Sequence, residues 1–369
     1  MSELSDLIAD LVRIESGSPD LDPTGSGEAE IAAFITPWLT RAGLEVHQQE
    51  SAPGRPNVIG VRHGTGGGRS LMFNAHMDTV SLGGMADGLE PRIKGNRLYG
   101  RGAYDMKASL AAVMLAVRDL GDEPLAGNVI VTAVTDEEYA SIGTQAIVAE
   151  YTADACIVTE PSHLELTLAH KGFIWADIET HGVAAHGSRP DVGIDAIAKM
   201  GPILTGIGEL DRRLRSGDGH PLLATGSLHA SLIEGGTELS TYPDRCRVKI
   251  ERRTLPGETD ELVEGQLRAL LFDDAELTMG ITRQPFETSP DAEFVRVAQS
   301  VIVDHHGQPP EITGATGWMD SALTSAAGIP TIIFGPTGDG AHADIEWIDL
   351  ASVQMCRAIY ATIARDWCH

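Results

Sequence analysis

The sequence predicts an α/β layered core that carries a smaller α+β domain as an insertion. Over residues 1–170 and 285–369, apolar runs typical of buried strands alternate with stretches of helical periodicity, which favours an α/β core. Between them, over 171–284, the clearest strand-like stretch alternates polar and apolar residues, as in a sheet that is buried on one face only. A length of 369 residues is also too great for one ordinary core. We therefore expect two domains, with the second inserted into the first.

The first part of the core is expected to begin with two helices and two strands. Apolar residues recur at helical spacing over 4–12, and a second helix is expected over 28–44, with Pro37 as a kink. Residues 57–64 and 70–78 are strand-like, and the glycine cluster that joins them predicts a hairpin connection. This cluster precedes a strand instead of linking a strand to a helix, so it does not indicate a phosphate-binding loop.

The rest of the core repeats the alternation of helix and strand. We expect a helix over 107–121 that ends at its glycine, and a terminal helix over 349–367 that Asp349 caps. Strands that are buried on both faces form continuous apolar runs. Such strands are expected at 128–134, 155–160 and 329–336.

The inserted segment follows the order strand, helix, strand, strand, helix, strand. Its helices are expected over 196–214, with an interruption at Gly201-Pro202, and over 260–271. The strand "RCRVKIERR" alternates strictly, with its apolar residues on one face and its charged residues on the other. The apolar face holds Cys246, Val248 and Ile250, and the polar face holds Arg247, Lys249 and Glu251.

The composition excludes several classes of partner. The formal net charge is −26, from 53 acidic and 27 basic residues, which argues against binding to nucleic acid or to anionic membranes. No apolar run approaches the ~18 residues that suggest a membrane span. The first helix carries acids and no basic leader, so it does not resemble a signal peptide. The four scattered cysteines include no CxxC pair and are expected to be buried, reduced thiols. We expect a cytoplasmic protein.

Residues that bind metals gather where apolar runs end. In open α/β sheets, ligands bind at the carboxyl ends of the strands. Four predicted strands end in, or lead to, such residues, and an acid just before a helix adds a fifth position. In chain order they are His76 with Asp78, Asp105 before the helix, the triplet Asp136-Glu137-Glu138, Glu160, and His342. Mixed imidazole and carboxylate ligands favour zinc, with manganese and cobalt as alternatives.

Two short patterns suggest a division of roles. His76 and Asp78 are two apart on a strand and share a face, so Asp78 is suited to accept the second imidazole N–H and fix the tautomer of His76. A turn cap is the alternative for Asp78. Glu137 and Glu138 point to opposite sides of an extended segment and cannot serve one partner in the same way. Taken alone, the triplet is also compatible with a solvated turn.

Together these residues resemble the di-zinc family of deacylases and exopeptidases. Its members include acetylornithine deacetylase, succinyl-diaminopimelate desuccinylase, the aminoacylases and bacterial glutamate carboxypeptidases. The resemblance covers essentially the whole chain and implies a zinc-exopeptidase-like three-layer core with a ferredoxin-like lid and dimerisation domain. It rests on the motifs "NAHMDTV", "YGRGAYDMK", "TDEEYASIGT", "VTEPS", "HGVAAHGSRPDVGIDAI", "ERRTLPGE" and "FGPTGDGAHADIEWI".

The resemblance implies two zinc ions, with cobalt or manganese as alternatives. It assigns one metal to His76, Asp105 and Glu160, and the other to Asp105, Glu138 and His342. Asp105 is then the carboxylate that bridges both metals. The two metals would lower the pKa of a water held between them and polarise the substrate carbonyl.

The same resemblance implies catalytic roles for neighbouring residues. Glu137 would face the water between the metals as general base and then as acid, with Asp136 as a turn residue. A base must reach that water without being a ligand, and a residue adjacent to a ligand meets both conditions. Glu346, four residues beyond His342, is expected to orient the loop of that histidine, with a solvated glutamate as the alternative.

Lid residues are expected to bind the substrate. The resemblance places His186 as a stabiliser of the oxyanion, often across a dimer interface in relatives, and Arg253 as the anchor of a substrate carboxylate. Two of the departures from the family pattern bear on the substrate. Ser240 replaces an asparagine near the oxyanion or the substrate, and Ala322 replaces an arginine, which weakens the case for a second acid on the substrate.

We therefore expect a zinc amidohydrolase that cleaves the amide of a small N-acyl amino acid, and that forms a homodimer through its lid. A dipeptidase or carboxypeptidase of the same family is the main alternative. A non-catalytic metal-binding relative is a third hypothesis. Glu137 argues against it, because a protein that only binds metal has no use for a base that is not a ligand.

Overall fold

The computed structural model describes residues 2–121, 123–272 and 274–369, and the chain divides into two compact units. The first unit contains the chain up to Leu168 together with Thr288–Thr313 and Met319–His369. The second contains Ala169–Glu287 and Gly314–Trp318. None of the helices in the described residues combines the length and the apolar character that a bilayer-spanning helix needs.

A mixed sheet forms the centre of the first unit. Strands β3, β6, β7 and β15 run parallel to their neighbours in the middle, whereas β1 and β2 are antiparallel at one side. Every residue of these four central strands is buried, as expected for strands covered on both faces. In spatial order the strands are β1 (Glu45–Ala52), β2 (Arg55–Arg62), β6 (Val129–Val134), β3 (Leu71–His76), β7 (Ala155–Val158), β15 (Thr331–Ile333) and β8 (Leu166–His170).

The predicted hairpin between β2 and β3 is wrong. β6 lies between these two strands, antiparallel to β2 and parallel to β3. A glycine-rich connection permits a tight turn but does not require the strands on either side to pair. This order places the end of β6 beside the start of β2, with Val58 opposite Ala133.

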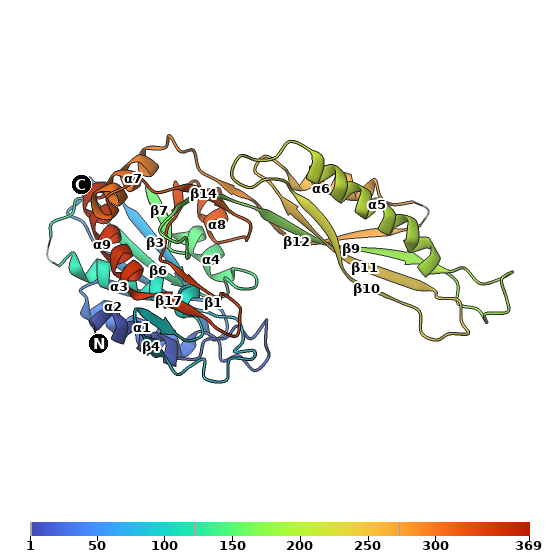
Figure 1. Ribbon diagram of the computed structural model, residues 1–369, viewed down its shortest axis with the longest axis horizontal. Coiled ribbons are helices and arrows are strands. Elements are labelled where there is room, and N and C mark those ends of the chain that lie inside the picture. Colours follow the sequence, from blue (N-terminus) through green and yellow to red (C-terminus); the bar gives the residue numbers. More distant parts are fainter. Residues whose placement is uncertain (1, 122, 273) are drawn as a thin grey trace. The chain divides into compact units, whose positions relative to one another are not determined.

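Helices cover both faces of the sheet, which gives three layers (Figure 1). On β3, the ring of Phe73 contacts that of Tyr360 in α9, whereas the amide of Asn74 donates to the hydroxyl of Thr144 in α4. Because neighbouring strand residues point to opposite faces, α9 and α4 lie on opposite sides of the sheet. The helices of this unit are α1 (Glu3–Arg13), α2 (Ala29–Arg41), α3 (Ala108–Asp119), α4 (Ile142–Glu150), α7 (Glu293–His306), α8 (Ser321–Ala326) and α9 (Leu350–Trp367).

The described helices of the first unit follow the sequence closely, with one local difference at η1. A π-helical turn, η1 (Ala103–Lys107), precedes α3 and carries Asp105. Helix α2 continues through Pro37. The predicted cap of α9 is confirmed, because the Asp349 carboxylate accepts the Ser352 N–H at 2.8 Å.

A small second sheet connects two distant segments of the first unit. Its strands are β4 (Arg92–Lys94), β5 (Arg97–Tyr99), β16 (Gly338–Asp339) and β17 (Trp347–Asp349), in the order β16-β17-β5-β4. Trp347 pairs with Tyr99, so the chain shortly before Asp105 is held beside the chain shortly after His342.

The second unit is a four-stranded antiparallel sheet with two helices, and its order β10-β11-β9-β12 is that of a ferredoxin-like fold. Val248 and Ile250 of β11 pack in one buried cluster with Met200 of α5 and Val263 of α6. The predicted interruption at Gly201-Pro202 is wrong, since α5 continues through both residues. The elements are β9 (Gly172–His181), α5 (Ala196–Ser216), β10 (Ser227–Gly235), β11 (Arg245–Thr254), α6 (Asp260–Arg268) and β12 (Glu276–Arg283).

Two short strands complete the described structure. β13 (Phe286–Glu287) and β14 (Ile312–Ala315) both pair with β8. All four cysteines of the chain are buried and unpaired, as the sequence predicts.

Candidate active site

The predicted site residues of the first unit converge at one edge of the central sheet. β3 ends at His76, β6 leads into the acid loop (defined here as residues 135–143), and β7 ends two residues before Glu160. These strands are parallel neighbours, so their carboxyl ends lie at the same edge. The segment after β15 brings His342 to the same place.

Asp105 lies between the two histidines of this cluster. Its Oδ1 is 3.0 Å from Nε2 of His76, and its Oδ2 is 3.5 Å from Nε2 of His342. Nε2 of His76 is also 3.6 Å from Glu160 Oε1, and Nε2 of His342 is 2.9 Å from Glu138 Oε2. The five residues thus form two groups, each with one imidazole, that share the Asp105 carboxylate.

Two sets of three ligand atoms lie close enough to hold a metal ion. Within each set all atoms are within 4.8 Å of one another, and the sets are His76 with Glu137 and Glu160, and His76 with Asp105 and Glu138. Glu137 therefore lies close to the same cluster, next to His76 and Glu160.

The carboxylates of the cluster repel one another electrostatically. Burial and the Glu160 carboxylate raise the pKa of Glu137 well above its ordinary value. Burial also raises the pKa of Glu160, and Asp105 and Glu138 raise it further. For Glu138, burial and Asp105 raise the pKa. A cation bound among these groups would relieve their mutual repulsion, so the donor set fits a metal with oxygen and nitrogen ligands.

The two histidines carry the compensating charge. Hydrogen bonds with Asp105 and Glu138 raise the pKa of His342 to about 10. Burial lowers the pKa of His76, but Glu160 and Asp105 outweigh burial and raise it well above its ordinary value. Without metal, the protonated imidazoles thus form ion pairs with the carboxylates. A metal ion would displace these protons when it binds.

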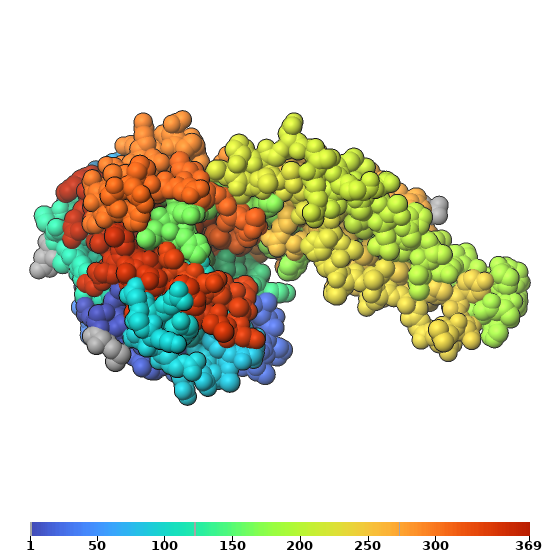
Figure 2. Space-filling view, viewed as in Figure 1, coloured from blue at the N-terminus to red at the C-terminus, as the bar shows by residue number. Residues whose placement is uncertain are grey.

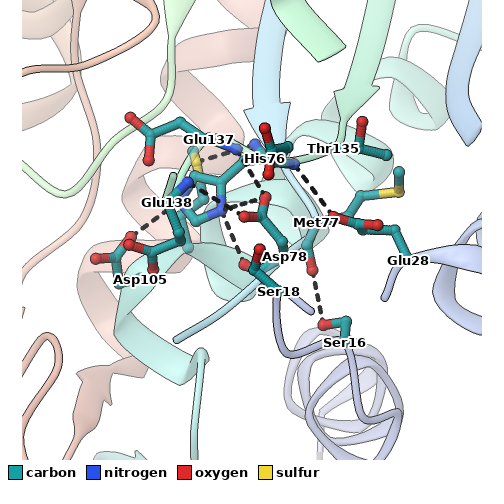
Figure 3. A network of polar contacts seen from close by, with 12 residues as sticks. Ser16, Ser18, Glu28, His76, Met77, Asp78, Asp105, Thr135, Glu137 and Glu138 are labelled. Carbon is teal, nitrogen blue, oxygen red and sulfur yellow. Dashed lines mark hydrogen bonds and ion pairs between the residues drawn. The ribbon is translucent and has the colours of Figure 1, made fainter. Parts of the chain in front are cut away.

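Asp78 organises the acid loop (Figure 3). Its Oδ1 accepts the main-chain N–H of Glu137 and its Oδ2 accepts that of Glu138, both at 3.1 Å. Nδ1 of His76 lies 2.9 Å from the main-chain oxygen of Asp78 and 3.6 Å from its carboxylate. The shorter contact to His76 is therefore made by the carbonyl of Asp78, and not by the carboxylate predicted to hold this ring.

Asp136 does more than form a turn. Its φ is 66°, as a turn residue in the left-handed region, but its side chain is buried and its Oδ1 accepts from Nη1 of Arg55 at 2.9 Å. Asp320 is a second buried carboxylate near the cluster, which accepts from the Thr144 hydroxyl at 2.6 Å. Burial raises the pKa of Asp320 to about 6, although the Thr144 hydrogen bond lowers it. The sequence offers no signal for the Arg55–Asp136 pair, because no local pattern links residues on separate elements.

Glu346 is buried, so the solvated alternative is wrong. Its carboxylate accepts the N–H groups of Gly102, Tyr104 and Asp105 at 3.0, 2.8 and 3.1 Å. It also accepts from Nη1 of Arg101 at 2.9 Å. Its direct contacts are with the Asp105 loop, and Arg101 also donates to the Ala343 carbonyl in the His342 loop.

The predicted lid residues belong to the second unit. The loops that carry His186 and Ser240 lie side by side at one end of it, where the Ser240 carbonyl accepts the Gly187 N–H at 2.7 Å (Figure 2). Nδ1 of His186 is 2.8 Å from the Ser188 hydroxyl. Arg253 lies on β11, with Nε donating to Glu251 at 2.7 Å and the guanidinium 5.2 Å from the centre of the Phe173 ring.

The neighbouring Arg252 is a different case. Its side chain is buried and is paired with Glu258, so it is not a carboxylate anchor. Arg253, by contrast, keeps 30% of its side chain exposed. Neighbouring strand residues point to opposite faces, so Arg252 is buried whereas a ligand can reach Arg253.

Comparisons with known proteins identify a family and several relatives. The model of peptidase family M20/M25/M40 matches residues 72–366. The chain is 30% identical to the acetylornithine deacetylase of Vibrio cholerae, covering 93% of this chain and 92% of that one. It is 27% identical to the N-formyl-4-amino-5-aminomethyl-2-methylpyrimidine deformylase of Bacillus subtilis, with coverage of 99% and 95%.

Solved structures share the fold. The aminopeptidase PepT of Bacillus cereus superposes with a TM-score of 0.82 at 20% identity, covering 99% of this chain and 98% of that one. An M20 family metallo-carboxypeptidase of Sulfolobus solfataricus gives a TM-score of 0.80 at 18% identity, with 99% of both chains covered.

The fold, the cluster and the relatives define a metal-dependent hydrolase of amide bonds. The chain belongs to peptidase family M20/M25/M40.

Proposed function

We propose that this hydrolase uses two zinc ions to remove a small acyl group from the amine of an N-acyl amino acid. The observation that carries the proposal is the position of Asp105, which presents one carboxylate oxygen to each of two imidazoles. A carboxylate that can bridge two metals is the arrangement a two-metal hydrolase needs. The names of the relatives, a deacetylase and a deformylase, support removal of a small acyl group.

His76, Asp105 and Glu160 would hold one zinc, and Asp105, Glu138 and His342 the other. When bound, the metals supply a water of lowered pKa and polarise the carbonyl of the amide. Cobalt and manganese are the alternatives for this set of nitrogen and oxygen ligands.

Glu137 would act as the general base and then as the acid. Its side chain is partly exposed, so an incoming substrate can reach it, and its backbone is fixed by the Asp78 carboxylate. Its position beside a proposed ligand, close to His76 and Glu160, suits a group that must take a proton from water and return it to the departing amine. Asp78 would support this step by orienting both the acid loop and, through its carbonyl, the ring of His76.

Lid residues would complete the substrate site. His186 would donate to the oxyanion, and Ser240 on the adjacent loop would shape the space beside it. Arg253 would bind the substrate carboxylate with the part of its guanidinium that remains exposed. We assign the lid to 171–284 and the catalytic domain to 1–170 and 285–369.

We also propose that the protein forms a homodimer through the lid and works in the cytoplasm. β10 is an edge strand of the lid sheet, and Leu232 and Ile233 on it are 65% and 55% exposed. Edge strands with exposed apolar residues are suited to pair with a second chain. Four buried, unpaired cysteines agree with a reducing compartment.

The test is amine release by the zinc-loaded protein from a panel of N-formyl, N-acetyl, N-succinyl and longer N-acyl amino acids, with dipeptides beside them. Glu137→Gln is the blank, because it keeps the shape of the side chain and removes the base. We expect turnover of short N-acyl amino acids only. Turnover confined to dipeptides would establish the exopeptidase instead. Activity that survives in Glu137→Gln would refute the role of the base.

A further inference from the structure

The acid loop has an unusual backbone that its own residues do not stabilise alone. Asp136 and Ser141 both have positive φ, 66° and 56°. Residues other than glycine adopt this region at a cost, and they remain there only where surrounding structure holds them. Glu137 and Glu138 lie between these two points, so their directions depend on whatever fixes the loop.

Arg55 holds the backbone at Asp136, the first of the two residues with positive φ. It is buried at the start of β2, and its Nη1 donates to Asp136 Oδ1 at 2.9 Å. Its Nε donates to Glu28 Oε2 at 2.9 Å, and Glu28 Oε1 in turn accepts the main-chain N–H of Asp136 at 3.2 Å. The guanidinium thus fixes the side chain of Asp136 directly and the acceptor of its N–H through Glu28.

Asn57 holds the two ends of the same loop. It lies two residues after Arg55 on β2 and is buried. Its Oδ1 accepts the Thr135 N–H at 3.0 Å, and its Nδ2 donates to the Gly143 carbonyl at 2.9 Å. A Cβ on Gly143 would stand 2.7 Å from Asn57 Oδ1, so the close approach requires glycine. Residues i and i+2 of a strand share a face, which aims both side chains at the acid loop.

We propose that Arg55, with Asn57 beside it, is a positioning residue that sets the directions of Glu137 and Glu138. The Asp78 carboxylate accepts both of their N–H groups, so a rotation of the peptide after Asp136 would break these bonds and turn both side chains. Because Glu137 and Glu138 directly follow Asp136 in one turn, a small rotation there would misplace the proposed base and the proposed ligand together. This inference rests on the proposed roles of Glu137 and Glu138.

Asp20 offers a matched control within the same contact set. Its carboxylate accepts from the same Nη1 of Arg55 as Asp136 does, but its side chain is 51% exposed and it lies far from the acid loop in the sequence. Asp20→Asn and Asp136→Asn each remove one negative partner of Arg55. Only Asp136→Asn changes a residue of the acid loop.

The experiment measures kcat, KM, metal content and melting temperature for zinc-loaded Arg55→Met, Arg55→Lys, Asp136→Asn and Asp20→Asn. Losing a group that orients a metal ligand typically costs 10–100-fold. We expect Arg55→Met and Asp136→Asn to lower kcat by about 10–100-fold on this basis, with KM within about threefold. Arg55→Lys should recover part of kcat, and Asp20→Asn should retain all of it. If Arg55→Met does not fold, Arg55→Lys and Asp136→Asn carry the test.

The outcomes separate this inference from the proposed function. A purely structural role would lower the melting temperature in Arg55→Met and leave kcat of the folded enzyme unchanged, which would overturn the inference. An equal loss of kcat in Asp20→Asn and Asp136→Asn would overturn it as well. If Glu137→Gln keeps its activity, the proposed function fails. An inactive Glu137→Gln beside a fully active Arg55→Met refutes the positioning role alone.

Discussion

The carboxylate of Glu346 accepts the main-chain N–H of Asp105 at 3.1 Å. The same carboxylate accepts a hydrogen bond from Nη1 of Arg101, and Nη2 of Arg101 donates to the carbonyl of Ala343 at 3.0 Å. Through Glu346 and Arg101, the loop of Asp105 is therefore joined to the loop of His342.

Replacing Glu346 with glutamine should weaken metal binding. Glutamine keeps one acceptor oxygen but loses the charge that pairs with Arg101, so the Asp105 loop is held less firmly. By analogy with other residues that orient ligands, zinc affinity should fall by about 10–100-fold, measured by competition with a chelator. Asp344→Asn is the control, because Asp344 is exposed in the same segment and bonds Gly84 instead. Equal affinity in Glu346→Gln and the wild type would contradict the role.

Replacing Asp105 with alanine should remove both metals together. Each of its carboxylate oxygens faces a different imidazole, so neither site keeps its full set of ligands. Elemental analysis of the purified variant should show less than one zinc per chain, against two in the wild type. A count that remains near two would show that Asp105 does not bridge.

Zinc uptake should release protons and weaken as the pH falls. The pKa of His342 is raised to about 10 by Asp105 and Glu138, so the imidazole is protonated at neutral pH before metal binds. Because binding requires the deprotonated form, lower pH favours the protonated cluster over the metal. Calorimetry of zinc binding in buffers of different ionisation enthalpy should reveal the released protons. An affinity that does not change between pH 6 and 8 would contradict this prediction.

Replacing His186 with alanine should reduce kcat with little effect on metal content. One donor to an oxyanion is typically worth ~2.7–4 kcal/mol, or roughly 10²–10³ in rate. His181→Ala, in the same unit on β9, serves as the control. Steady-state kinetics that give the same kcat for both variants and the wild type would identify His186 as a surface residue.

The order of elements could be predicted from the sequence because it depends on local periodicity. The continuous apolar runs of β3, β6 and β7 and the alternation of β11 each follow from which faces are buried. The residues at the strand ends were predictable for the same reason, since parallel strands bring their carboxyl ends to one edge. Predictions failed where a local signal was ambiguous, as at Gly201-Pro202, where the helix continues.

By itself, the sequence determined the α/β core, the order of strands and helices in the inserted segment, and His76, Asp105 and His342 as residues of one candidate site. The tertiary structure alone decided how these residues are held. Arg55 and Asp136 are 81 residues apart, and Glu346 and Asp105 are 241 apart. No periodicity connects such residues. They meet because β6 pairs with β2 and because β17 pairs with β5, and strand order is a property of the whole packed chain.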